Sequence, residues 1–200
     1  MLRIIVFFIV LANNFGILSR AILAVFWYMK AAEQNCALAQ NQLGVKYRLG
    51  LGVERDDKQA FDLYLKSAEG GNAIAQNNLG WMYAHGCGTE QNYELAIKWL
   101  HESIENGCLG AYNELAWTYH LINKYDDALP WAEKAIVESP DNPNYIDTLA
   151  TVYQGLGRYN EAMEQFELCL KLYQDNEKSE EGIRRTEDKI NKLKALIEQS

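Results

Sequence analysis

The strongest constraint on the fold of this chain is an internal repeat with a period of 36 residues. Residues 39–44 (AQNQLG) recur as residues 75–80 (AQNNLG), and the same offset relates Tyr47 to Tyr83 and Tyr83 to Tyr119. A fixed period of roughly 20–50 residues is typical of proteins built from short units that stack along one direction. The sequence therefore predicts an array of structural repeats.

The period shortens to 34 residues in the second half, where Tyr119 recurs as Tyr153. The change lies in the loop inside each unit. Tyr83 and Tyr93 are ten residues apart, whereas Tyr119 and Tyr125 are only six apart. The later units therefore lack four residues of this loop, and two related types of repeat follow one another along the chain.

Each unit is predicted to be a pair of antiparallel helices. In the second unit the periodicity indicates helices over residues 73–84 and 93–106. Gly80 lies inside the first helix, where glycine costs about 1 kcal/mol, so a close helix–helix approach must offset that cost. Gly107 suits a left-handed residue at the end of the second helix. The residues expected to face inward are Gln76, Leu79, Gly80, Tyr83, Ala96, Trp99, Leu100 and Ser103.

Three motifs of the second unit, residues 79–83 (LGWMY), 86–88 (GCG) and 93–99 (YELAIKW), together resemble a Sel1-like repeat. The spaced Leu, Ala, Tyr and Phe positions between residues 115 and 169 resemble tetratricopeptide repeats. The resemblance implies an all-α fold, a right-handed α-α superhelix or solenoid of stacked antiparallel helix pairs. It implies Sel1-like repeats at residues 21–108 and tetratricopeptide-like repeats at residues 109–172.

A charged segment at residues 173–200 follows the repeats and is predicted to be a capping helix, because a stack of repeats needs a polar end. Its apolar residues form a narrow helical stripe. This stripe consists of Ile183, Ile190, Leu193 and Ile197. A short helical dimerisation seam stays open as an alternative, although about three heptads is marginal for a coiled coil.

Residues 1–20 have three interpretations. Arg3 and the apolar run at residues 4–12 are typical of a bacterial signal peptide or an anchor. Residues 13–16 (NNFG) echo residues 77–80 (NNLG), which favours a degenerate first helix, and a wrongly assigned start is the third interpretation. A signal or anchor would make the protein periplasmic, secreted or membrane-associated, with membrane contact through residues 1–29; otherwise we expect it in the cytoplasm.

The sequence carries no pattern typical of an enzyme. The histidines His85, His101 and His120 are not spaced as in metalloproteases, and there is no phosphate-binding loop or dinucleotide fingerprint. Cys36 and Cys108 occupy equivalent places two repeats apart, too far for a disulfide, so we expect free thiols. We therefore predict no catalysis, no metal, no cofactor and no small-molecule substrate.

The net charge of −8, without a basic cluster, argues against nucleic acid as a partner. A protein or peptide partner is expected instead. The resemblance implies that such a partner binds in a concave groove lined by the first helix of each unit. By register, the groove residues are Asn41, Arg48, Asn77, Trp81, His85, Asn113, Trp117 and His120. The last unit would add Asp147, Thr151 and Gln154.

Asparagine recurs at the repeat period within this stripe, as Asn41, Asn77 and Asn113. An Asn amide both donates and accepts, so it can hold a peptide backbone without reading its side chains. Trp81 and Trp117 lie one turn further on and could be rigid aromatic anchors. The alternative is that these residues only pack successive helices together. The sequence thus favours a non-enzymatic scaffold or adaptor that binds a peptide or helix, with a membrane-associated or periplasmic accessory protein as the alternative.

Overall fold

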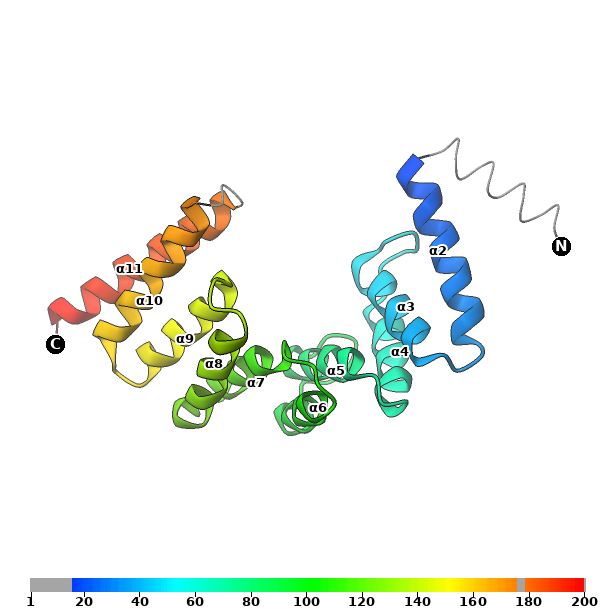
Figure 1. The fold of residues 1–200 in the computed structure, drawn as a ribbon, viewed down its shortest axis with the longest axis horizontal. Helices are drawn as coiled ribbons and strands as arrows, with labels where there is room; N and C mark the ends of the chain where they lie inside the picture. The colour runs from blue at the N-terminus through cyan, green and yellow to red at the C-terminus, as the bar shows by residue number, and fades with distance from the viewer. Residues whose placement is uncertain (1–15, 176–178, 200) are drawn as a thin grey trace. The chain divides into compact units, whose positions relative to one another are not determined.

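The computed structural model describes residues 16–175 and 179–199, and these contain ten α-helices (Figure 1). In chain order they are α2 (Gly16–Ala32), α3 (Ala37–Leu49), α4 (Asp57–Glu69), α5 (Ala73–His85), α6 (Tyr93–Glu105), α7 (Ala111–Leu121), α8 (Tyr125–Glu138), α9 (Pro143–Gly155), α10 (Tyr159–Asp175) and α11 (Glu180–Gln199). Closely packed helix pairs follow the sequence: α3 with α4, α5 with α6, α7 with α8, and α9 with α10. The predicted all-helical fold of sequential antiparallel pairs is confirmed.

The chain forms two compact units, residues 1–108 and residues 109–200. In the first unit, an asparagine or aspartate side chain caps the start of α4, α5 and α6. The side chains of Asp56, Asn72 and Asn92 each accept a hydrogen bond from a backbone N–H three residues later, which satisfies a donor that the helix leaves unpaired. Gly50 and Gly86 end α3 and α5 in the left-handed conformation. These caps set the helix boundaries.

The helices predicted for the second repeat are confirmed to within one residue as α5 and α6. Gly80 lies where these helices touch: a Cβ added there would stand 2.6 Å from Leu100 Cγ. Gly107 follows α6 with a φ of +87°, as expected. Six of the residues predicted to face inward are buried, while Tyr83 and Trp99 are half-buried and pack against the core.

A serine joins the two helices of one repeat at the same place in two successive repeats. The Oγ of Ser67 in α4 donates to the carbonyl of Ala37 over 2.6 Å, and the Oγ of Ser103 in α6 donates to the carbonyl of Ala73 over 2.7 Å. Both serines are fully buried. Each second helix is therefore fixed to the start of the first helix of its own repeat.

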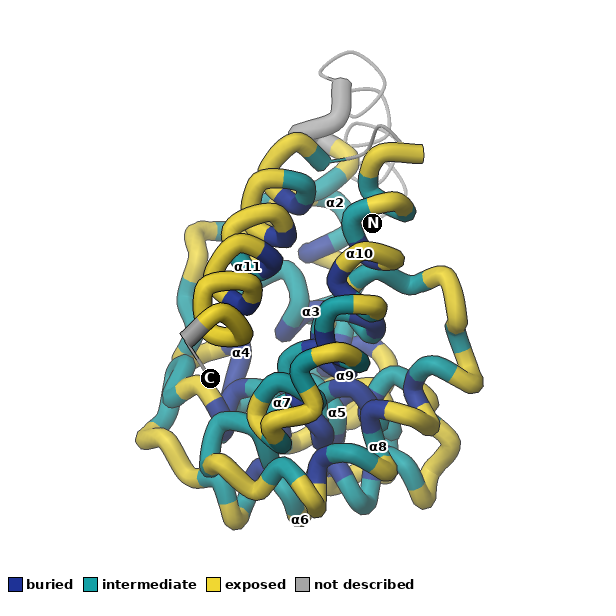
Figure 2. The backbone as a smooth tube through the Cα atoms, turned by 90° about the vertical axis from the view of Figure 1, so that its left-hand side faces the viewer, coloured by how far each residue is buried: buried dark blue, intermediate teal, exposed yellow. Residues whose placement is uncertain are grey.

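The second unit is built on alanine-rich contacts among α7, α8, α9 and α10. Its last helix, α11, packs against α10 and buries Ile190 and Leu193 in the same core cluster as Phe166. Figure 2 shows the buried positions of α11 on the side that faces α10 and the exposed positions on the other side. Two residues of the apolar stripe, Ile190 and Leu193, are therefore buried within the unit, whereas Ile197 at its end is 37% exposed.

The interpretations of the N-terminus fall mainly on residues 1–15, which lie outside the described residues. Residues 16–20 belong to α2, which packs against α3. None of the helices in the described part of the chain is long and apolar enough to cross a membrane.

Candidate protein-binding surface

The predicted groove residues lie on the first helix of each repeat, which is α3 or α5 in the first unit and α7 or α9 in the second. Each of these helices buries one face, which carries a leucine and follows the 3.6-residue period of the helix. The groove residues occupy neighbouring positions of the helix, so their exposure ranges from fully buried to exposed. Each unit is considered by itself below.

In the first unit, three side chains form a stack across α3 and α5. The guanidinium carbon of Arg48 lies 5.1 Å from the centroid of the Trp81 ring, a cation–π contact. The Trp81 ring in turn stacks on the His85 ring, with 4.4 Å between centroids and an angle of 21°. The structure therefore brings together Arg48, Trp81 and His85, which the sequence had placed on one face.

The stack is held in place from within its own helix. The Nδ1 of His85 lies 2.9 Å from the carbonyl oxygen of Trp81, so the ring donates its Nδ1–H to this carbonyl. His85 is exposed and Trp81 is half-buried. Beside them, Arg48 Nε is a buried donor without a hydrogen-bond partner among the described residues.

Burial raises the pKa of the neighbouring Tyr64 hydroxyl, and the charge of Arg48 partly opposes this rise. The tyrosine is therefore a neutral hydroxyl beside the guanidinium at physiological pH. None of the ion pairs among the described residues includes Arg48.

The asparagines of the first unit differ from one another. Asn41 is buried, with only 1% of its surface exposed, and its Oδ1 accepts a hydrogen bond of 3.1 Å from Asn78 Nδ2. Asn77 is half-buried, and its Oδ1 is buried without a hydrogen-bond partner among the described residues. The geometry at Asn41 is that of a contact between α3 and α5, whereas Asn77 retains an unused acceptor.

In the second unit, α7 carries Asn113, Trp117 and His120. Asn113 is 9% exposed, and its Oδ1 has no hydrogen-bond partner among the described residues. The rings of Trp117 and His120 lie with centroids 4.8 Å apart. An unused amide acceptor and an indole–imidazole pair thus occur here as they do in α5.

The imidazole of His120 is neutral at physiological pH. Burial lowers its pKa, the positive charge of Lys189 lowers it further, and Asp147 opposes both effects. Its Nδ1 is buried without a hydrogen-bond partner among the described residues. A neutral ring can donate from one nitrogen and accept at the other, which suits an amide group as ligand.

The equivalent stripe of α9 is partly used within the unit. Asp147 forms an ion pair with Lys189 of α11, with Nζ to oxygen distances of 2.6 and 2.7 Å. The hydroxyl of Thr151 donates to the carbonyl of Asp147. Since α11 contacts this stripe, Asp147 serves the attachment of the last helix.

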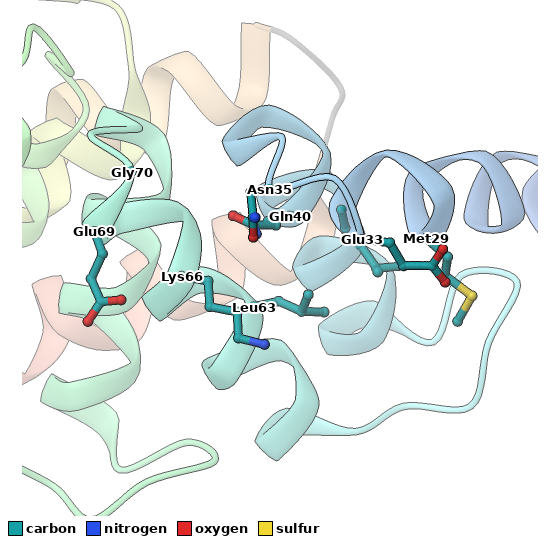
Figure 3. A pocket seen from close by; sticks show the side chains of 10 residues that line it. Met29, Glu33, Asn35, Gln40, Leu63, Lys66, Glu69 and Gly70 are labelled. Atoms are coloured by element: carbon teal, nitrogen blue, oxygen red, sulfur yellow. The ribbon is translucent and has the colours of Figure 1, made fainter.

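The first unit also has a hollow that sequence reasoning missed (Figure 3). It has a volume of about 640 Å³ and lies between α2, α3 and α4. Residues that line it include Met29, Glu33, Gln40, Leu63 and Lys66. No motif indicates this hollow, because it depends on the spacing between two helices of neighbouring repeats and not on any residue pattern.

The cysteines are free in the structure. Cys36 is exposed, Cys87 and Cys108 are half-buried, and Cys169 is fully buried. Burial raises the pKa of the Cys169 thiol to about 11, so this group stays protonated. Among the described residues no three His, Cys, Asp or Glu side chains are grouped so as to hold a metal ion.

Comparison with known families agrees with the repeat boundaries seen in the fold. The Sel1 repeat family matches residues 15–36, 37–72 and 73–108, and tetratricopeptide repeat families match residues 108–137 and 145–176. This chain is a Sel1-like repeat protein that also contains tetratricopeptide repeats. Proteins of this class generally mediate protein–protein interactions and are usually not catalytic.

Solved structures with the same fold include a Sel1 repeat protein from Oxalobacter formigenes, which is 26% identical with a TM-score of 0.62. The match covers 84% of this chain and 76% of that one. The protective antigen c5321 of uropathogenic Escherichia coli, which displays an SLR fold, is 28% identical with a TM-score of 0.60; the match covers 88% of this chain and 41% of that one. MamA, at 23% identity and a TM-score of 0.61, shares the fold over 78% of this chain and 90% of its own. Comparison with curated proteins finds no significant match.

Proposed function

We propose that this protein is a non-enzymatic scaffold that binds a peptide or a helix of a protein partner on the first helices of its repeats. The observation that carries the proposal is the recurrence of one arrangement in α5 and α7. Each helix has a buried amide oxygen, on Asn77 or Asn113, that has no hydrogen-bond partner in the described part of the chain, and it lies one turn before an indole that contacts an imidazole.

An unpaired buried acceptor costs roughly 1–3 kcal/mol, so a ligand that supplies a donor recovers this cost. The backbone N–H groups of a peptide are such donors, and they occur in every peptide sequence. The half-buried faces of Trp81 and Trp117 offer flat apolar area with little side-chain entropy to lose. These features support peptide recognition in which the amides hold the backbone and the indoles select an apolar side chain.

The predicted groove residues are not equally available to a ligand along the chain. Asn41 already has a partner in Asn78, and Asp147 is paired with Lys189. We therefore assign peptide binding to Asn77, Trp81 and His85 with Arg48 in the first unit, and to Asn113, Trp117 and His120 in the second. Asn41 is assigned to packing between α3 and α5.

The test is selection of peptides from a random displayed library on the purified full-length chain, followed by titration of the selected peptides. The double variant Asn77→Ala with Asn113→Ala should weaken binding at least about tenfold, because two hydrogen bonds to buried acceptors are lost. Its melting temperature should be nearly unchanged, since neither Oδ1 accepts a hydrogen bond from any of the residues that the structure describes.

The matched control is Asn160→Ala, which removes an exposed asparagine from α10, a second helix of its repeat. This change should leave both binding and melting unaffected. A large fall in melting temperature for the double variant, with binding intact, would assign Asn77 and Asn113 to packing and overturn the proposal.

A further inference from the structure

The helix α2 has an outward face that is apolar. Ile22, Phe26 and Trp27 have about half of their surface exposed, at 51%, 48% and 49%. The rings of Phe26 and Trp27 contact each other edge to face, with centroids 5.4 Å apart. Ile22 and Phe26 are four residues apart and lie on one stripe, whereas Trp27 lies about 100° further round the helix, on the side opposite the buried Val25.

In the following repeats, the positions equivalent to Ile22 and Phe26 carry charged residues instead of apolar ones. The 36-residue offset relates Ile22 to Lys58 in α4 and Phe26 to Asp62. Lys58 and Asp62 form an exposed ion pair with 2.7 Å between Nζ and Oδ1. A second step of the offset reaches Glu94 and Lys98 in α6, which are also exposed.

In the following repeat, the first helix does not cover the equivalent positions. This first helix, α3, is packed against α4, yet Lys58 and Asp62 still have 66% and 45% of their side chains exposed. The positions of Ile22 and Phe26 therefore face solvent even in a complete repeat. What covers them must come from outside the repeat stack.

We propose that this face of α2 binds a lipid bilayer surface, with Ile22, Phe26 and Trp27 inserted at the boundary between head groups and acyl chains. Aromatic side chains are enriched at that boundary. Arg20 is exposed on the same helix and can reach lipid phosphates, as can the exposed Lys30, whose Nζ donates to Glu33 Oε2 over 2.9 Å in the free protein.

The geometry fits a helix that lies on the bilayer and does not cross it. The described part of α2, with 17 residues, is about 25 Å long, shorter than the roughly 30 Å of a bilayer core. Its opposite side is committed to α3. An interfacial helix needs only one apolar face and a short depth of insertion. This inference goes beyond the proposed peptide binding and does not rest on it.

The test is flotation of the full-length protein with vesicles of phosphatidylcholine mixed with phosphatidylglycerol. The variant Ile22→Lys with Phe26→Asp places on α2 the ion pair that α4 carries at the same register, so the helix should stay folded. We expect the wild type to float with the vesicles and the variant to bind at least about tenfold more weakly, because two inserted apolar side chains are lost. The matched control is Val137→Asp, which removes an apolar side chain that is 80% exposed on α8, and should float as the wild type does.

Three results would overturn the proposal. Equal flotation of wild type and variant would assign membrane binding to residues upstream of α2. A wild type that does not float, but whose mass in sedimentation falls from dimer to monomer in the variant, would make the face a contact between two copies. A wild type that does not float and remains monomeric would show that lipid does not cover this face. Titration of the variant with the selected peptides keeps this result separate from peptide binding, which should be unchanged.

Discussion

At the scale of single residues, glycines determine how closely the helices of one repeat can approach. Gly80 of α5 leaves no room for a methyl group, because an added Cβ would lie 2.6 Å from Leu100 Cγ and 3.2 Å from the carbonyl of Ala96. Gly44 has the same role beside Tyr64 in the preceding repeat. In both repeats the glycine leaves the space that the large side chain opposite it fills.

Gly80→Ala should therefore destabilise the protein by about 1–3 kcal/mol, although alanine is the better helix former, because Leu100 and the backbone of α6 must move. Chemical denaturation measures this change. The matched control is Gly110→Ala at the start of α7, where the nearest atom to an added Cβ is Tyr145 Oη at 3.8 Å and φ is −60°. This control should be neutral to slightly stabilising. Equal stability of the two variants would mean that α5 and α6 are not as close as the structure has them.

The asparagines show what a sequence can and cannot predict at this scale. Periodicity placed Asn41, Asn77 and Asn113 at equivalent positions, but it could not give their hydrogen-bond partners. The partner of Asn41 is Asn78, which is present because the second repeat has two asparagines in succession, where the third has Asn113 and Glu114. The environment of each of these asparagines therefore depends on neighbouring residues that do not themselves recur with the repeat.

At the scale of helices, the sequence predicted much more. The helix boundaries of the second repeat follow from side chains that act locally: Asn72 and Asn92 begin α5 and α6, and Gly86 ends α5. Local hydrogen bonds and a left-handed glycine need no distant partner, so they are readable in the sequence. The hollow between α2, α3 and α4 depends on distances between helices, which no local signal encodes.

The last helix gives a test at this scale. Leu193 of α11 is fully buried against the cluster that contains Phe166, whereas Leu196 of the same helix is 43% exposed. Leu193→Ala should destabilise the protein by about 2–5 kcal/mol because it leaves a cavity. Leu196→Ala should change stability by less than about 0.5 kcal/mol. If the two variants were equally stable in thermal or urea denaturation, the apolar stripe of α11 would serve another role, such as the dimerisation seam that the sequence left open.

At the scale of the whole molecule, stability in a repeat protein is approximately a sum over repeats and their nearest-neighbour interfaces. A defect in one repeat should therefore weaken that repeat and its neighbours far more than distant ones. The cysteines can report on this, because Cys169 is buried in α10 while Cys87 lies in the loop after α5, against the core cluster of the first unit.

In the native protein we expect an alkylating reagent at pH 8 to modify the exposed Cys36 first and Cys169 last. Cys169 is buried and its pKa is raised to about 11, so only about one thiol in a thousand is ionised at that pH. Leu193→Ala should increase the modification rate of Cys169, since α10 loses its packing against α11. The same substitution should leave the rate at Cys87 unchanged, because that residue belongs to a repeat far away in the sequence. Mass spectrometry after timed alkylation gives both rates in one sample. A parallel increase at Cys87 would mean that the chain opens as a single cooperative unit, and the additive description of its repeats would then be wrong.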